Sequence, residues 1–148
     1  NNDYLISYQE ILKDILKTNK NFFHIHPGYL PKIKGADGSL HSVLNYNEIG
    51  ASLFKIVTKI DEGPIIYRKL SKFKKFSSNH LKNWNNKDLY RLWFSFFDPA
   101  LRCSILIDYL NNMFTLDDRV ELNKQESNKY FTFMKTEDLS KVFKKIIF

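Results

Sequence analysis

Short apolar runs alternate with amphipathic stretches over the first part of the chain. Residues 4–8 and residues 22–26 form compact apolar runs typical of buried strands. Between them, residues 9–17 carry apolar side chains at the spacing of one helix face, namely Ile11, Leu12, Ile15 and Leu16. Strand, helix and strand in this order predict a βαβ unit, whose two strands are parallel and joined by a right-handed crossover.

A turn-rich segment and a second pair of strands follow. Residues 27–38 are rich in proline and glycine, which predicts a shaped loop, and Asp37 is expected to cap the helix that comes next. Residues 51–59 alternate between apolar and polar side chains, and residues 65–70 form another apolar run. These two predicted strands are close enough in sequence to pair as a hairpin.

The second half of the chain has a different pattern. Residues 71–87 are polar and basic, which predicts a loop or linker. Residues 88–111 place apolar, largely aromatic side chains along a helix, and Pro99 predicts a kink or a split into two helices. A short strand at residues 130–133 and a helix at residues 137–146 complete the predicted elements.

Composition narrows the setting of the protein. The chain has 148 residues and a net charge of +7, which suits one domain and favours anionic partners such as nucleotides, phosphates or RNA. Its lysines are scattered, however, so a solvated basic surface is the stronger alternative to a nucleic-acid patch. Cys103 is the only cysteine, which excludes an internal disulfide and a cysteine-based zinc cage and fits a reducing, cytoplasmic location. No apolar run reaches the roughly 20 residues of a membrane helix, so no membrane partner is expected.

Two histidines end the second predicted strand. His24 and His26 share one face of that strand, at the carboxyl end where open α/β sheets bind ligands. The rings could share a metal, satisfy buried backbone groups, or act in catalysis beside a carboxylate; the metal interpretation is the weakest, and no metal is expected. Asp61, on a glycine-containing turn, is the candidate carboxylate. It is expected to raise the pKa of the histidine and to hold an imidazolium that stabilises an oxyanion.

Two blocks around these residues resemble the formyltransferase family. The first block is His26-Pro27-Gly28-Tyr29-Leu30-Pro31, followed by Lys34-Gly35-Ala36-Asp37, and the second is residues 57–61 followed by Gly63-Pro64-Ile65-Ile66. They are similar to the family signature Asn-x-His-Pro-(Ser/Gly)-x-Leu-Pro, a basic residue with glycine, and then Asp-x-Gly-x-Ile. The family includes the glycinamide ribonucleotide, methionyl-tRNA and sugar N-formyltransferases.

The resemblance implies transfer of a formyl group from formyltetrahydrofolate to an amine. His26 takes the position of the family's histidine, which would stabilise the oxyanion of the tetrahedral intermediate and help to move a proton. Asp61 takes the position of the family's aspartate, which would hold His26 charged. The resemblance further implies cofactor contacts from Tyr29, Leu30, Pro31, Ile60, Asp61 and Glu62, and substrate contacts from Gly28, Gly35 and Asp37.

Two departures from the family pattern stand out. His24 occupies the place of the family's asparagine, so as a third candidate catalytic residue it either replaces that amide donor or lowers the activity. Family members also carry several strands and helices before the stretch that matches Tyr4. The resemblance therefore implies an α/β fold in which residues 1–70 are the carboxyl-terminal half of a Rossmann-like formyltransferase core, with a mostly parallel sheet and flanking helices. Residues 71–87 would be a linker, and residues 88–148 a mainly helical, aromatic-rich extension packing on that core.

The loop sequence HPGYLP is most similar to that of the sugar N-formyltransferases, which implies a nucleotide-linked amino sugar as acceptor. A methionyl-tRNA formyltransferase relative, with tRNA as partner, is the first alternative. A truncated or non-catalytic formyltransferase-like protein is the second. The aromatic side chains of the predicted helices either pack in the core or form the interface of a homodimer.

Overall fold

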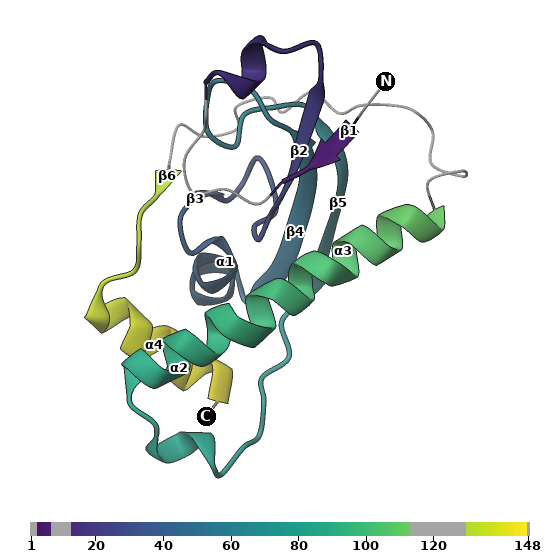
Figure 1. The fold of residues 1–148 in the computed structure, drawn as a ribbon. Coiled ribbons are helices and arrows are strands. Elements are labelled where there is room, and N and C mark those ends of the chain that lie inside the picture. The colour runs from purple at the N-terminus through teal and green to yellow at the C-terminus, as the bar shows by residue number, and fades with distance from the viewer. Residues whose placement is uncertain (1–2, 7–12, 113–129, 148) are drawn as a thin grey trace.

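A four-stranded sheet forms the centre of the structure, a computed structural model that describes residues 3–6, 13–112 and 130–147. The strands lie in the order β1-β2-β4-β5 (Figure 1), with the bounds β1 Asp3–Leu5, β2 Asn21–His26, β4 Glu48–Lys55 and β5 Ile65–Lys72. β1 pairs with β2 in parallel, whereas the β2–β4 and β4–β5 pairs are antiparallel.

The predicted α/β class, with flanking helices and a helical carboxyl-terminal region, is confirmed. The parallel β1–β2 pair agrees with the predicted crossover unit. β4 and β5 form the predicted hairpin, because a short turn can only return the chain antiparallel to itself. Within these four strands the sheet is therefore mixed, and the expected parallel pairing holds for β1 and β2 alone.

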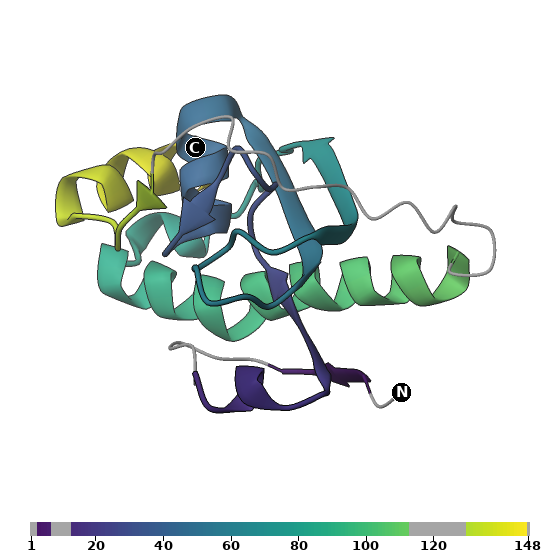
Figure 2. The same cartoon turned by 90° about the horizontal axis from the view of Figure 1, so that it is seen from above.

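Helices cover both faces of the sheet. Their bounds are α1 Gly38–Tyr46, α2 Asn86–Leu92, α3 Asp98–Asn112 and α4 Thr136–Ile147, with 3-10 turns at Ile15–Lys17 and Leu81–Asn83. Figure 2 shows α3 running along one face, where it contacts β2, β4 and β5, while α1 contacts β4 and α4. None of these helices is long and apolar enough to cross a bilayer.

The helix predicted over residues 9–17 falls partly outside the described residues. Its described part is one 3-10 turn, Ile15–Lys17, which ends where the Thr18 hydroxyl and N–H both donate to the Ile15 carbonyl.

A π-helix, Trp93–Phe97, joins α2 to α3 in one continuous rod (Figure 1). Pro99 has no N–H, and in a straight α-helix its ring would clash with the carbonyl of Ser95. The wider π turn lies directly before the proline and takes up this conflict. The predicted kink or split is thus realised as a change of helix type within the rod.

Apolar side chains gather in three clusters. The largest joins α1, α2 and α4 and includes Leu40, Trp93 and Ile146. The second lies between the sheet and α3, and a small third one places Leu30 against Phe54 and Ile65. The third cluster therefore fixes the loop after β2 on the sheet.

Two segments far apart in the sequence meet in a second, two-stranded sheet. β3, Lys34–Gly35, pairs in parallel with β6, Tyr130–Phe131. The strand predicted at residues 130–133 and the helix predicted at residues 137–146 are both confirmed, as β6 and α4. The loop after β2 is thereby covered by residues nearly one hundred positions away in sequence.

Replacing Gly63 by alanine is expected to destabilise the fold by about 1–3 kcal/mol, the usual cost of overpacking. A Cβ atom at Gly63 would lie 1.6 Å from the Lys55 carbonyl oxygen, so the backbone of the β4–β5 turn would have to move. Urea unfolding followed by circular dichroism measures the change. Ser71→Ala, an exposed position in the same hairpin, is the control, and an unchanged midpoint for Gly63→Ala would contradict the clash.

Candidate active site

β2 ends at His26, whose ring is enclosed by the loop that follows. The side chain is 3% exposed, and its Nε2–H donates to the Ile33 carbonyl over 3.0 Å. Gly28 and Gly38 pack directly on the ring, because a Cβ at either position would lie 2.6 Å and 3.1 Å from Nε2. The local sequence thus uses two glycines to fit backbone around one histidine.

Asp61 approaches the other ring nitrogen of His26. Its carboxylate Oδ2 lies 3.5 Å from Nδ1, and both side chains are buried. The Asp61 backbone is left-handed (φ 54°), a conformation that aspartate tolerates better than most residues. The N–H of Gly35 donates to the same Oδ2 over 2.7 Å. The structure therefore brings together the two residues that the sequence singled out for chemistry.

Burial is the main influence on the pKa of His26. Removal of the ring from water lowers its pKa below the usual 6.5, and the nearby Asp61 charge and the hydrogen bond to Ile33 oppose this without reversing it. Arg102 lowers the pKa further. The expected raised pKa is therefore wrong in its net direction. At neutral pH the ring is neutral, its proton sits on the Nε2 that faces Ile33, and its Nδ1 is free to accept a proton beside Asp61.

The His24 ring is hydrogen-bonded to the backbone carbonyl of Ile6. Its Nδ1–H donates to the oxygen of Ile6 over 3.0 Å, and its ring meets Phe54 edge-on at 5.8 Å. Burial is the main cause that lowers the pKa of His24 to about 4, so the ring is neutral at pH 7. A neutral imidazole has a single N–H donor, and here Ile6 uses it. Of the two alternatives for His24, replacement of the family's amide donor or a lowered activity, this arrangement favours the second.

The low pKa of His24 predicts a stability that depends on pH. A histidine whose pKa is lowered on folding contributes stability that is fully present above 6.5 and is lost as the pH falls toward 4. The loss amounts to about 3 kcal/mol for a shift of this size. Urea unfolding at pH 7 and pH 4.5 measures it. His24→Asn is expected to reduce the difference between the two pH values, whereas the exposed His80→Asn control is not; equal pH dependence in all three proteins would refute the assignment.

The predicted cofactor residues fall into two groups. Leu30 is fully buried, and its N–H and carbonyl bond the Ser52 hydroxyl and Arg68, whose guanidinium also lies 4.6 Å above the Tyr29 ring. The peptide bond between Leu30 and Pro31 is cis. The second group follows β4: Ile60 is 52% exposed, whereas Asp61 and Glu62 turn inward.

The predicted substrate residues are used mainly in shaping the loop. Gly28 makes room for His26, and Gly35 has a φ of 95° and lies so close to Phe131 that a Cβ would be 2.2 Å from its carbonyl oxygen. Asp37 occupies the predicted cap position of α1, where its carbonyl accepts the His41 N–H, but its side chain makes no capping hydrogen bond. Its carboxylate instead accepts from the Tyr90 hydroxyl (3.0 Å) and the Met134 N–H (2.8 Å), which ties α2 and the segment before α4 to this loop.

A buried polar network behind β2 was not predicted. Asp98 accepts from the Ser39 hydroxyl (2.8 Å) and from Arg102 Nε (2.8 Å), and Arg102 also donates to the Ile25 carbonyl between the two histidines (3.1 Å). The Trp93 indole donates to Ser39. The sequence signal was the pair of opposite charges four residues apart on an otherwise apolar helix.

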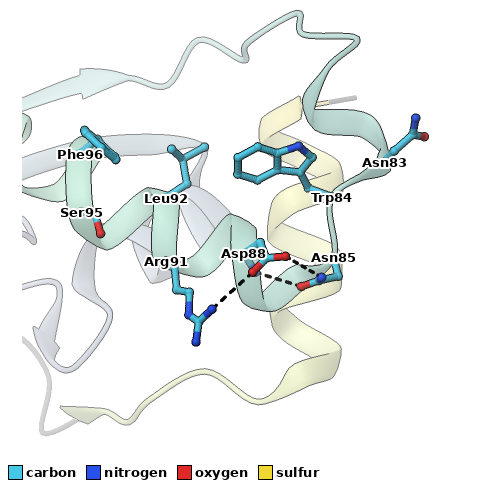
Figure 3. Close-up of a pocket in the computed structure, with 8 residues that line it drawn as sticks. All are labelled: Asn83, Trp84, Asn85, Asp88, Arg91, Leu92, Ser95 and Phe96. Atoms are coloured by element: carbon cyan, nitrogen blue, oxygen red, sulfur yellow. Dashed lines mark hydrogen bonds and ion pairs between the residues drawn. The ribbon is translucent and has the colours of Figure 1, made fainter.

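One pocket of the described residues lies beside β2, and another lies at the start of α2. A groove of about 280 Å³ borders His24 and is lined by Leu5, Ile6, His24, Ile25, Arg102, Cys103 and Leu106. A larger pocket of about 470 Å³ lies at the start of α2 and shares no lining residue with it (Figure 3). There, Asp88 is already bonded to both Asn85 and Arg91.

No group of three or more His, Cys, Asp or Glu side chains is placed to hold a metal ion within residues 3–6, 13–112 and 130–147. His24 and His26 therefore have no third metal ligand in that part of the chain.

Comparison with known proteins finds similarity both in sequence and in structure. No family model matches the chain. A methionyl-tRNA formyltransferase from Pelagibacter ubique (strain HTCC1062) is 39% identical over 69 residues, which cover 43% of this chain and 22% of that protein.

Two solved formyltransferases share the fold. An N-formyltransferase from Helicobacter canadensis, in complex with folinic acid and dTDP-3-aminofucose, is 19% identical, with a TM-score of 0.59 over 98% of this chain and 54% of its own. The formyltransferase PseJ from Anoxybacillus kamchatkensis, in complex with UDP-4,6-dideoxy-4-formamido-L-AltNAc and tetrahydrofolate, is 18% identical, with a TM-score of 0.56 over 88% and 62%. The chain thus spans about a fifth of its curated relative and somewhat more than half of these two. The chain is thus similar in sequence to a methionyl-tRNA formyltransferase over 69 residues, and it shares the fold of the two solved formyltransferases.

Proposed function

We propose that the protein transfers a formyl group from formyltetrahydrofolate to the amine of a nucleotide-linked amino sugar. The observation that supports this most directly is the contact between His26 Nδ1 and Asp61 Oδ2 at 3.5 Å, inside the two blocks that resemble the family. The division into a core over residues 1–70, a linker and a helical extension is part of the same proposal.

The His26–Asp61 pair would accept the proton that the amine loses during formyl transfer. The Nε2–H of His26 is fixed on the Ile33 carbonyl, so the ring can gain a proton only at Nδ1. A proton gained there faces the Asp61 carboxylate, which stabilises the imidazolium that forms. The resting ring is neutral, so Asp61 stabilises a charge on His26 only when the ring takes the proton of the amine. This interaction therefore stabilises the transition state more than the ground state and lowers the barrier.

The turn after β4 has the features of a donor-binding surface. Formyltetrahydrofolate would supply the one-carbon unit and an extended aromatic ring system. Ile60, half exposed beside the inward-turned Asp61 and Glu62, offers an apolar surface next to polar groups, which suits such a ligand. Tyr29 and Pro31, with Leu30 buried between them, would form the second wall.

The choice of acceptor is supported by the sugar enzymes among the structural relatives. Those from Helicobacter canadensis and Anoxybacillus kamchatkensis were solved with a nucleotide-linked sugar together with a folate. The loop sequence HPGYLP is also of the sugar-enzyme type.

Incubation of the full-length protein with formyltetrahydrofolate and a panel of dTDP- and UDP-linked amino sugars tests the proposal. Mass spectrometry should detect a product heavier by one formyl group, and the same nucleotide sugars without the amine should give none. Absence of product from every acceptor, in a sample shown by circular dichroism to be folded, would reject the function. Calorimetric titration with folate then distinguishes an enzyme with another acceptor from a protein that binds no folate.

A second candidate function is formylation of methionyl-tRNA. The curated relative favours it, and the net charge of +7 is compatible with an RNA partner. Charged initiator tRNA replaces the amino sugars in the same assay. Formylation of the tRNA, together with binding that weakens steeply as salt rises, would favour this candidate over the first.

A further inference from the structure

Lys34 is the least compensated charged group near the His26–Asp61 pair. Its side chain is completely buried, and its ammonium has no hydrogen-bond partner among the described residues. Glu62 Oε1 lies 3.8 Å from the ammonium, and the Tyr130 ring centroid lies 5.6 Å away. A buried charge with so little compensation usually destabilises a fold relative to an apolar side chain of similar size. Packing alone therefore does not account for lysine at this position.

Lys34 and Gly35 together contact both acidic residues of the turn after β4. The N–H of Gly35 donates to Asp61 Oδ2 over 2.7 Å, while the Lys34 ammonium faces Glu62. Two consecutive residues of β3 thus hold two consecutive residues of the turn. The Asp61 carboxylate that faces His26 is one of the groups so held.

β6 holds the same two segments from the other side. The backbone of Tyr130 and Phe131 pairs with Lys34 and Gly35, and the Ala36 N–H donates to the Phe131 carbonyl over 2.9 Å. The Tyr130 hydroxyl lies between the Ile60 carbonyl (3.2 Å) and the Glu62 carboxylate, and donates toward both.

β6 is itself fixed to α1. The His41 ring donates to the Thr132 carbonyl over 2.9 Å and lies 4.5 Å from the Phe131 ring. α1 therefore fixes the position of β6, and the Tyr130 hydroxyl in turn fixes the position of the Glu62 carboxylate.

We propose that Lys34, Glu62 and Tyr130 form a clamp that positions the Asp61 carboxylate against His26. These three are positioning residues, since each acts on His26 through Asp61. The clamp explains why the left-handed backbone at Asp61 is held, and why an otherwise costly lysine is buried beneath Tyr130. Its role in catalysis rests on the proposed function, whereas its effect on His26 does not.

Loosening the clamp should let Asp61 move away from His26. The charged and titratable groups that face His26 are Asp61 from the turn, Asp98 and Arg102 from α3, and His24 on the same strand. Asp61 is the main charge that opposes the effect of burial, so its departure lowers the pKa of His26 further.

The test uses two single variants of the whole protein. Tyr130→Phe removes only the hydroxyl and keeps the ring and the strand pairing. Lys34→Met removes the charge, keeps an unbranched apolar stem and is expected to leave the free energy of unfolding unchanged or higher. Tyr109→Phe, on the far side of the sheet, is the matched control. NMR of ¹⁵N-labelled histidine follows the titration of His26, and steady-state kinetics gives kcat and KM separately.

Both variants are expected to lower the pKa of His26, and to lower kcat about tenfold to a hundredfold with little change in the KM of the acceptor, as misplacement of a catalytic group does. An unchanged His26 titration in both variants would overturn the clamp, whatever the kinetics. If the wild-type protein transfers no formyl group, the proposed function fails, yet the titration still decides the clamp. Should Tyr130→Phe unfold, Lys34→Met and Glu62→Gln carry the same comparison.

Discussion

Replacing His26 by glutamine should lower the rate of formyl transfer about 10²- to 10⁴-fold, the range of a lost general acid–base group. Glutamine can still donate an N–H to the Ile33 carbonyl, so the loop after β2 keeps its anchor. It cannot accept a proton beside Asp61, so the imidazolium never forms. The change is measured as kcat at saturating donor and acceptor.

His80→Asn is the control for His26→Gln, because His80 is an exposed histidine outside the candidate site. The control should retain the wild-type rate. A glutamine variant that is folded and keeps more than a tenth of the activity would remove His26 from the proposed chemistry.

Replacing His24 by asparagine should raise kcat, by up to about a hundredfold to a thousandfold, the usual worth of one oxyanion donor. The neutral His24 ring has a single N–H, which donates to the Ile6 carbonyl. An asparagine amide carries two N–H groups, so one can serve Ile6 while the other points to a developing oxyanion. Restoring the residue expected from the family resemblance should therefore restore a donor that the histidine lacks.

His24→Leu separates this gain from a change of shape, because leucine has nearly the same outline as asparagine but no donor. It should show no increase in kcat. Equal rates for the asparagine variant and the wild type would mean that the oxyanion is stabilised by groups other than residue 24.

The local parts of the fold were predictable because they depend on short-range patterns. The apolar run at residues 22–26 gives β2, and the short turn between β4 and β5 forces a hairpin. The approach of Asp61 to His26 was expected from the family resemblance and from the turn between the two predicted strands, and it is made by that turn, because the antiparallel β4 itself ends beside the start of β2.

The unpredicted features depend on contacts between distant residues. Asp37 occupies the predicted cap position of α1, yet its carboxylate bonds Tyr90 and Met134, 53 and 97 residues away. The direction of the His26 pKa depends on how completely the loop and α1 exclude water, which a single sequence does not encode in any local pattern. The contact of Tyr130 with the turn after β4 was missed for the same reason.

The rod formed by α2, the π-helix and α3 has a consequence for how the protein unfolds. Trp93 of this rod belongs to the cluster with α1 and α4, and Ile105 of the same rod belongs to the cluster with the sheet. Neither cluster can lose its part of the rod without straining the part held by the other. The two cores are therefore thermodynamically linked, and heat or denaturant should melt them together in a single cooperative transition.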